Sequence, residues 1–285
     1  MNLCKQNSQQ ATLEDAEFFK LSKFIVNHFG IKMPPTKKTL LQSRLQKRLK
    51  ELHFGSFEEY VDYLFSINGQ HNEVPHMIDA VSTNKTDFFR EQVHFEFLRD
   101  QGLKRYIGLT GKNRLSIWSA GCSSGEEPYS IAMTMNEFLQ DHSLVHYRIL
   151  ATDIAGSVLE QAETGIYSEE KVSEVPMIYK QKYMLKGRNN SLRKVRINSE
   201  LREKIEFMKF NLLSNDFQSL GKFDIIFCRN VLIYFDRDVQ FRILLKFCDV
   251  LNEGGYLFLG HSESITGYVL PLKPIRPTIF TKAAD

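Results

Sequence analysis

Residues 118–129 read Trp-Ser-Ala-Gly-Cys-Ser-Ser-Gly-Glu-Glu-Pro-Tyr, and this stretch decides the fold. It follows a short apolar run at residues 115–118 that predicts a buried strand. Behind it, apolar residues from Ile131 to Leu139 recur at helical spacing. A strand that turns through glycines into a helix is the nucleoside-binding corner of doubly wound α/β folds. The stretch therefore predicts a Rossmann-like α/β domain with a ligand at this corner.

The charges of this stretch favour a cationic ligand. Gly121 and Gly125 lack a Cβ atom, so they admit positive φ angles and a close approach of the ligand to the backbone. A phosphate site would present bare N–H groups and the helix dipole to the anion, but Glu126 and Glu127 occupy the first helical turn. These carboxylates would repel a pyrophosphate. They suit S-adenosylmethionine, which carries a sulfonium and an ammonium group and no phosphate, so we predict a methyl-donor site.

Strand and helix patterns alternate through the rest of this domain. The run 223–228 is almost continuously apolar, as expected for a parallel sheet that is buried on both faces. Gly254 and Gly255 are expected to open a later strand at 256–259. Further strands are predicted at 147–153, 205–212 and 278–281, the last a candidate antiparallel strand, with helices at 157–164 and 236–251.

Polar residues at the predicted strand ends are candidate ligand contacts. Asp153 ends the second strand, about thirty residues after Gly121, where an acid accepts both ribose hydroxyls of an adenosine ligand. An N-cap for the following helix is a compatible alternative. Residues 211–212 end the third strand and are placed to cover an adenine ring.

Residues 83–91, Thr-Asn-Lys-Thr-Asp-Phe-Phe-Arg-Glu, form an unusual arm ahead of the sheet. One interpretation is a helix capped by Thr86, with both phenylalanines in the core and Arg90 paired with a glutamate. In the other, Arg90 holds a substrate carboxylate in bidentate fashion. Asn84 and Thr86 would then bond the methionine end of the donor.

The first 80 residues predict a small all-helical domain, separate from the sheet domain at 81–285. Expected helices are one from Phe18 that stops at Gly30, one at 37–52, one opened by an N-cap box at Ser56, and one near 73–81.

The second of these helices carries a basic stripe. The leucines at 40, 41, 45 and 49 are expected to face inward, and Arg44, Lys47 and Arg48 to face outward. The stripe is either a solvated face or a docking surface for an acidic helical partner.

Residues 166–203 interrupt the strand–helix alternation over a span too long for a loop. The alternating residues 194–197 predict a small antiparallel β-subdomain, joined by a turn at 187–191. Its excess of lysine and arginine fits either an ordinary surface or an acidic partner.

Composition excludes several classes of protein. The chain has 285 residues, 42% of them hydrophobic, and a net charge of +3, which is far from the charge of a nucleic-acid-binding protein. It has neither a signal pattern nor the roughly 18 apolar residues of a membrane span. The four cysteines lack ligand-like spacing, so we expect reduced thiols and no metal site. We expect a cytoplasmic monomer that neither binds nucleic acid nor inserts into membranes.

Four segments together resemble the chemotaxis receptor methyltransferases of the CheR family. They are the arm at 83–91, Ala-Gly-Cys-Ser-Ser-Gly-Glu-Glu-Pro-Tyr-Ser at 120–130, Phe-Cys-Arg-Asn-Val-Leu-Ile-Tyr-Phe at 227–235, and Gly-His-Ser-Glu at 260–263. The resemblance implies an all-helical domain followed by a class I methyltransferase domain with an inserted β-subdomain. It also implies protein-glutamate O-methylation of chemoreceptor cytoplasmic helices, with S-adenosyl-L-methionine as donor and S-adenosyl-L-homocysteine as product.

The resemblance also implies roles for particular residues. Arg90 and Tyr234 are expected beside the transferred methyl group. Donor contacts are expected at Asn84, Thr86, Arg90, Glu127 with Glu126, Asp153, Asn211, Leu212, Cys228 and Arg229. The turn at 187–191 carries fewer glycines than in relatives that bind a receptor C-terminal pentapeptide. We therefore expect direct receptor docking by the helical domain through Arg44, Lys47 and Arg48.

Two other functions fit parts of the sequence. The first is a nucleic-acid or small-molecule methyltransferase of the same fold, but DNA amino-methylases place a Pro-Pro-aromatic turn where residues 229–234 contain no proline. The second is an S-adenosylmethionine-binding regulatory or scaffold protein that acts in signalling without receptor methylation. Arg90 and Tyr234 argue against this loss of catalysis.

Overall fold

The computed structural model describes residues 11–187 and 193–283. These residues form two compact units, which divide between Thr83 and Asn84, and each unit has a hydrophobic core of its own. The sequence placed this division between residues 80 and 81. None of the helices within the described residues is long and apolar enough to cross a membrane.

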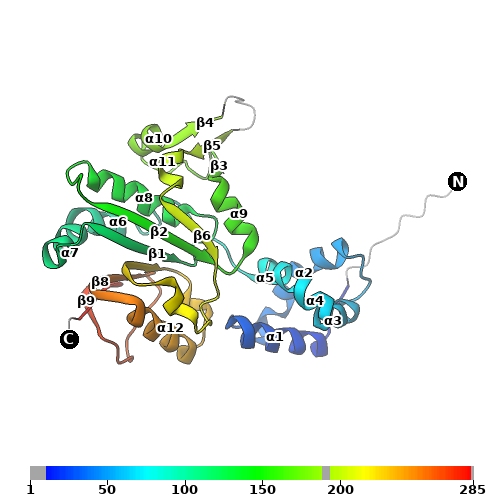
Figure 1. Ribbon diagram of the computed structural model, residues 1–285. Coiled ribbons are helices and arrows are strands. Elements are labelled where there is room, and N and C mark those ends of the chain that lie inside the picture. The colour runs from blue at the N-terminus through cyan, green and yellow to red at the C-terminus, as the bar shows by residue number, and fades with distance from the viewer. Residues whose placement is uncertain (1–10, 188–192, 284–285) are drawn as a thin grey trace. The chain divides into compact units, whose positions relative to one another are not determined.

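The first unit is helical (Figure 1), as predicted. The helix from the predicted first segment ends at Gly30, which takes a left-handed φ of 71°. Ser56 Oγ caps the third helix by accepting a hydrogen bond of 3.2 Å from the Glu59 N–H. The predicted helix near 73–81 is present, but a short helix at 67–72 was not predicted, because these residues carry no helical period of apolar residues. The helices are α1 (Asp15–Phe29), α2 (Lys38–Glu51), α3 (Phe57–Phe65), α4 (Ile67–Asn72) and α5 (Val74–Val81).

The basic stripe of α2 differs from its prediction. Lys47 is exposed, but the Arg48 side chain is only 16% exposed, and its Nη2 lies 2.6 Å from Oε2 of the buried Glu73. Arg44 is half-buried and donates to the carbonyl oxygens of Val81 and Ser82. All three predicted docking cations thus have partners within their own unit, but Lys47, which lies 3.6 Å from Glu51 Oε1, stays 82% exposed. The leucine prediction fails at position 40, which is 45% exposed, while the other three leucines are buried.

The second unit is built on a seven-stranded sheet in the order β6-β2-β1-β7-β8-β10-β9. The first five strands are parallel, and β10 runs antiparallel to β8 and β9. The predicted antiparallel strand at 278–281 is therefore confirmed, whereas β9 was missed. The strands are β1 (Arg114–Ala120), β2 (His146–Asp153), β6 (Ile205–Lys209), β7 (Phe223–Cys228), β8 (Leu251–Leu259), β9 (Leu272–Arg276) and β10 (Ile279–Lys282).

Helices cover both faces of this sheet (Figure 1). Ile117 and Phe227 face a core shared with α8 (Glu126–Leu139), whereas Trp118 and Cys228 face a core shared with α12 (Arg237–Val250). Burial on both faces explains why β7 reads as a continuous apolar run. The remaining elements are α6 (Val93–Phe97), the π-helix η2 (Leu98–Gly102), α7 (Leu103–Thr110), α9 (Gly156–Thr164), η4 (Asp216–Leu220) and η5 (Leu232–Tyr234).

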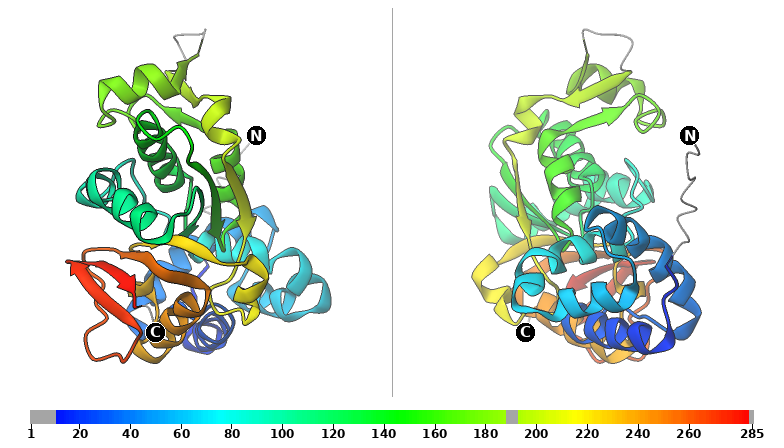
Figure 2. Two further views of the ribbon diagram at one scale, coloured as in Figure 1. Left: turned by 60° about the vertical axis from the view of Figure 1, so that its left-hand side comes forward. Right: turned by 90° about the vertical axis from the view of Figure 1, so that its right-hand side faces the viewer.

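The predicted insert is a separate antiparallel sheet in the order β3-β5-β4, which Figure 2 shows in yellow-green at one end of the second unit. Its turn at 188–191 lies outside the described residues. The helix α10 was missed, because its aromatic residues are too few to set a period. The insert contains β3 (Ile166–Ser168), α10 (Met177–Tyr183), β4 (Met184–Lys186), β5 (Lys194–Ile197) and α11 (Ser199–Arg202).

Two local predictions are wrong. The arm does not form a helix capped by Thr86, because Phe89 and Glu91 take left-handed φ angles of 53° and 56° and the helix begins only at Val93. The pair at 254–255 does not open β8, which begins at Leu251. Gly254 instead takes a φ of 71° inside the strand, where the register with β7 shifts.

Candidate active site

The predicted site residues of the second unit gather at the carboxyl ends of the parallel strands. The loop after β1 runs from Gly121 to Gly125, and the loop after β7 runs from Arg229 to Tyr234. Ligands of open α/β sheets bind at this edge, where the strand order reverses. β1 and β7 are neighbours that lie on either side of this reversal.

The glycines of the β1 loop have the backbone angles that were predicted. Gly121 and Gly125 take φ angles of 81° and 94°. A Cβ atom on Gly121 would lie 2.4 Å from Val231 Cγ2, and one on Gly125 would lie 2.8 Å from Ala162 Cβ. Close packing of protein against protein therefore requires these glycines, in addition to any approach of a ligand.

Glu127 belongs to a buried charge network. Its Oε1 accepts a 2.7 Å hydrogen bond from Ser119 Oγ, and its Oε2 lies 3.2 Å from Arg229 Nη1. Burial raises the pKa of Glu127, and the neighbouring guanidinium opposes this rise. The sequence assigned both Glu126 and Glu127 to the donor, but Glu127 already pairs with a cation of the protein, Arg229.

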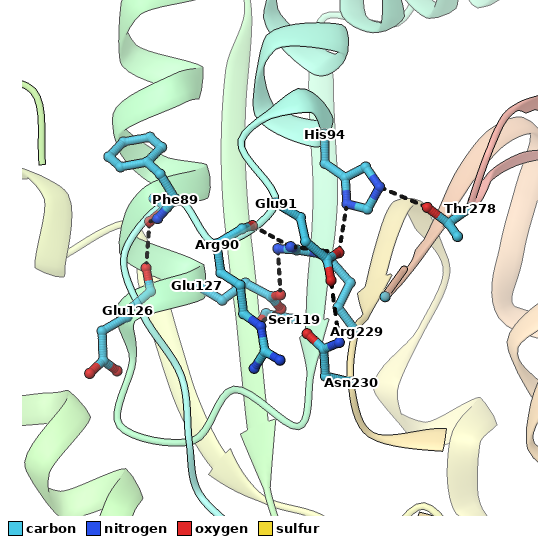
Figure 3. Close-up of polar contacts among 12 residues, drawn as sticks. Phe89, Arg90, Glu91, His94, Ser119, Glu126, Glu127, Arg229, Asn230 and Thr278 are labelled. Atoms are coloured by element: carbon cyan, nitrogen blue, oxygen red, sulfur yellow. Dashed lines mark hydrogen bonds and ion pairs between the residues drawn. The ribbon is translucent and has the colours of Figure 1, made fainter. Parts of the chain in front are cut away.

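Glu126 points away from Glu127 (Figure 3) and is fully buried. Its Oε2 accepts a 2.7 Å hydrogen bond from Ser124 Oγ. Its Oε1 receives no hydrogen bond from the described residues and lies 3.4 Å from Lys171 Nζ. Burial raises the pKa of Glu126. Glu126 Oε1 thus has one cationic neighbour, the Lys171 ammonium, and can still accept from a ligand that carries an ammonium group.

Asp153 connects the loops that follow β1 and β2. Its Oδ2 accepts a 2.8 Å hydrogen bond from the Ser123 N–H, and its Oδ1 accepts one of 3.0 Å from the Ala155 N–H. The carboxylate is buried at the strand end, beside the glycine loop. Its contact with a ribose stays a prediction.

Arg229 is the centre of the charge network (Figure 3). Its side chain is 1% exposed and bonds to Glu127, to the backbone oxygen of Arg90 and, at 3.0 Å, to Oε2 of Glu91. Burial alone would raise the pKa of Glu91. It is nevertheless lowered, because the His261 N–H and this guanidinium bond to the carboxylate. Arg229 therefore fixes the arm to the end of β7.

Arg90 does not pair with a glutamate, in contrast to one of the two interpretations of the arm. Its Nη1 donates to the Lys85 oxygen at 3.1 Å, and no other hydrogen bond joins its guanidinium to the described residues. The side chain is half-buried and extends away from His94 in Figure 3. Its remaining N–H groups can therefore still bind a carboxylate. Tyr234 is half-buried at the end of η5.

The other predicted donor contacts lie around the same edge. The Asn84 oxygen accepts a 2.9 Å hydrogen bond from Ser123 Oγ, and the Thr86 oxygen accepts one from Lys171 Nζ. Leu212 is 7% exposed, and Cys228 is fully buried at the end of β7. Asn211 follows β6 and accepts a 2.9 Å hydrogen bond from the Leu213 N–H.

Glu91, His94 and His261 offer ligand atoms within 4.8 Å of one another. His94 is fully buried, burial lowers its pKa to about 3, and its Nε2 lies 2.9 Å from Thr278 Oγ1. The Arg229 guanidinium already bonds the Glu91 oxygen that would face a metal ion. We therefore assign these three residues to the charge network.

The sequence did not single out three residues that shape this site. They are Ser119, Lys171 and Glu263, which bond to residues 8, 85 and 32 positions away along the chain, respectively. Glu263 is the last residue of Gly-His-Ser-Glu at 260–263, and this family-like segment was the only sequence feature that pointed to it.

Comparisons with known proteins identify the family of this fold and site. The model of the CheR methyltransferase SAM-binding domain matches residues 84–278, and that of the CheR methyltransferase all-alpha domain matches residues 16–82. The chain belongs to the CheR methyltransferase family. Its methyl donor is S-adenosylmethionine, as predicted from Glu126 and Glu127, and its second unit is a class I methyltransferase domain.

Three relatives of this CheR family member cover most of the chain, and each is named a chemotaxis protein methyltransferase. The relative from Borreliella burgdorferi is 41% identical and covers 90% of this chain and 92% of its own. The relative from Klebsiella aerogenes is 38% identical, with coverages of 92% and 87%. The relative from Escherichia coli is 37% identical, with coverages of 93% and 90%. The protein is thus an S-adenosylmethionine-dependent methyltransferase of chemotaxis.

Proposed function

We propose that the protein methylates glutamate side chains on the cytoplasmic helices of chemoreceptors, forming glutamyl methyl esters for sensory adaptation. The observation that carries this proposal is the contrast between two arginines. Arg229 is buried and bonded to Glu91 and Glu127, whereas Arg90 keeps most of its N–H donors available within the described site. An available guanidinium beside a donor loop suits a carboxylate substrate.

Carboxylate methylation requires little acid–base chemistry from the protein. The bound donor supplies a methyl group on a positively charged sulfur, and a glutamate is already ionised near neutral pH. Arg90 would hold the incoming carboxylate in its ionised form, and Tyr234 would donate a hydrogen bond or pack beside it. Burial lowers the pKa of His94 to about 3, so its imidazole is neutral and a weak base, and its Nε2 already bonds Thr278 Oγ1. We therefore give His94 no role as a base.

The main contribution of the protein is therefore to position the receptor carboxylate relative to the methyl group of the donor. Holding a nucleophile about 3 Å from the reacting carbon, in a fixed line, supplies up to several kcal/mol of the barrier reduction. Arg229 serves this purpose by fixing the arm, because the same guanidinium bonds the Arg90 backbone oxygen and the Glu127 side chain.

A transfer assay tests the proposal. Wild-type protein, a chemoreceptor cytoplasmic fragment and donor with a tritiated methyl group should yield label that alkali releases as methanol. Label that resists alkali would contradict carboxylate methylation and favour transfer to nitrogen. Donor binding by calorimetry with no transfer to any receptor fragment would instead support the regulatory or scaffold function.

Receptor docking by the helical unit is also part of the proposal, with Lys47 as its main contact. Lys47 is 82% exposed and pairs only at 3.6 Å with Glu51 of the same helix, whereas Arg44 is half-buried and the Arg48 side chain is 16% exposed. We expect Lys47→Glu to raise the KM for the receptor fragment and to leave donor affinity unchanged. The matched control is Lys23→Glu on α1. Micromolar binding of a receptor tail peptide in calorimetry would contradict docking without a pentapeptide tether.

A further inference from the structure

The Glu263 carboxylate lies in the turn that follows β8 and is almost fully buried. Its Oε1 accepts hydrogen bonds from the N–H groups of Val231 (2.9 Å) and Leu232 (2.7 Å). Its Oε2 accepts bonds from the N–H groups of Asn230 (2.9 Å) and Gly260 (2.6 Å). Four backbone donors therefore surround one carboxylate, which has roughly four acceptor positions in all.

Three of these donors are consecutive residues of the β7 loop. Asn230 takes a left-handed φ of 59°, which is uncommon for a residue other than glycine. A Cβ atom at Gly260 would lie 2.4 Å from Asn230 Nδ2, so the loop rests directly on the turn that carries Glu263. The carboxylate thus holds a loop in which Asn230 takes an uncommon backbone conformation.

The held loop contacts both halves of the site. Val231 packs against Gly121 of the donor loop, within 2.4 Å of where a Cβ would stand. Tyr234 follows in the same turn, and its N–H donates to the Val231 oxygen at 3.2 Å. Gln240 Nε2 holds the other end by donating to the Leu232 and Phe235 oxygens. The position of Tyr234 relative to the donor loop is therefore set through Val231.

We propose that Glu263 is a positioning residue for methyl transfer, which sets the distance between Tyr234 and the donor loop. Glu263 reaches the reaction only through the backbone of residues 230–232. This inference rests on the proposed function, because Tyr234 is placed beside the receptor glutamate there. It predicts that loss of the carboxylate lowers turnover more than donor binding.

The experiment compares Glu263→Gln with the matched control Glu253→Gln, an exposed glutamate on β8. In Glu263→Gln an amide NH₂ replaces one carboxylate oxygen and faces two backbone N–H groups. The loop therefore loses either its bonds from Val231 and Leu232 or its bond from Asn230, while the shape of the side chain is kept. We expect kcat to fall about 100-fold, as misplacements of about 1 Å do. Donor Kd should change less than about fivefold, and the amides of 230–232 should exchange hydrogen at least about tenfold faster.

Glu263→Ala with added acetate is the second arm of this experiment. Acetate can occupy the space of the missing carboxylate, so it should restore turnover in a saturable way, whereas chloride should not. Equal losses of kcat and donor affinity, or unchanged amide exchange in Glu263→Gln, would overturn the proposal. If wild-type protein methylated no receptor fragment, the proposed function would fail, while amide exchange and donor calorimetry would still decide whether Glu263 holds the loop.

Discussion

The loops that follow β1 and β7 are both held by a carboxylate from a neighbouring strand, but in different ways. Asp153, at the end of β2, accepts the Ser123 N–H of the β1 loop. Glu263, after β8, accepts three consecutive N–H groups of the β7 loop. The β1 loop carries two glycines at positive φ besides Ser123, whose φ is 49°, whereas the β7 loop has no glycine and takes a positive φ at Asn230.

The charged side chains beside the two loops also differ in how they are paired. At the β7 loop, the Arg229 guanidinium is bonded to Glu91 and Glu127. At the β1 loop, Glu126 Oε1 receives no hydrogen bond from the described residues, and its partner there is the Lys171 ammonium at 3.4 Å. The buried charges of the β7 side are therefore paired within the protein, whereas a carboxylate oxygen of the β1 side can still accept a hydrogen bond from a ligand. Substitutions should cost stability on the β7 side and donor affinity on the β1 side.

The largest expected effect is that of Arg229→Ala. Removing this guanidinium leaves Glu91 and Glu127 without their cation in a buried site, which costs about 3–5 kcal/mol of unfolding free energy. Urea denaturation measures the loss, with Arg237→Ala, an exposed arginine on α12, as control. A loss below about 1 kcal/mol, the range of exposed pairs, would show that the ion pairs of Arg229 do not stabilise the fold as buried pairs do.

Arg90→Ala should change turnover rather than stability. Its guanidinium bonds only the Lys85 oxygen among the described residues, so little of the fold depends on it. We expect kcat to fall about 10²–10³-fold, as on removal of one charge-stabilising donor. Donor Kd, measured by calorimetry, should stay within about threefold of wild type. Equal losses in turnover and donor affinity would remove the proposed role in holding the receptor carboxylate.

Asp153→Ala should show the opposite division. We expect donor affinity to fall about tenfold to a hundredfold, which corresponds to about 1.5–3 kcal/mol for a hydrogen bond to a charged group. Turnover at saturating donor should change less. Asp153→Asn is the matched variant, because its amide oxygen can still accept the Ser123 N–H. If Asp153→Asn binds donor as wild type does, the carboxylate serves the loop alone and the ribose contact is wrong.

The same contrast explains which features the sequence could predict. The glycine corner, the strand–helix alternation and the antiparallel insert follow from local patterns, and the structure confirms them. The pairing of Glu91 with Arg229 joins residues 138 positions apart, and Glu263 bonds backbone N–H groups that carry no side-chain signature. One of the two interpretations of the arm, the helix capped by Thr86, was wrong for a related reason, because Phe89 and Glu91 take left-handed angles that only tertiary contacts can impose.

The smallest expected effect is on the pH dependence of stability. It tests whether solvent reaches the buried His94 on the β7 side. Burial lowers the pKa of His94 to about 3, against about 6.5 in the unfolded chain. Between these values the unfolded state binds a proton that the folded state does not. Stability therefore falls as the pH decreases through this window, by about 1.5 kcal/mol from pH 6.5 to pH 5.

His94→Gln should remove this share of the pH dependence, whatever it does to stability at neutral pH. Urea denaturation at pH 6.5 and pH 5 measures the difference, and the exposed His146 supplies the control variant His146→Gln. The comparison depends on slopes rather than on absolute stability, so a general loss of packing in His94→Gln does not disturb it. An unchanged slope in His94→Gln would mean that water or a proton reaches the imidazole in the folded state. The β7 side would then be open to solvent, and the contrast with the donor side would rest on hydrogen bonding alone.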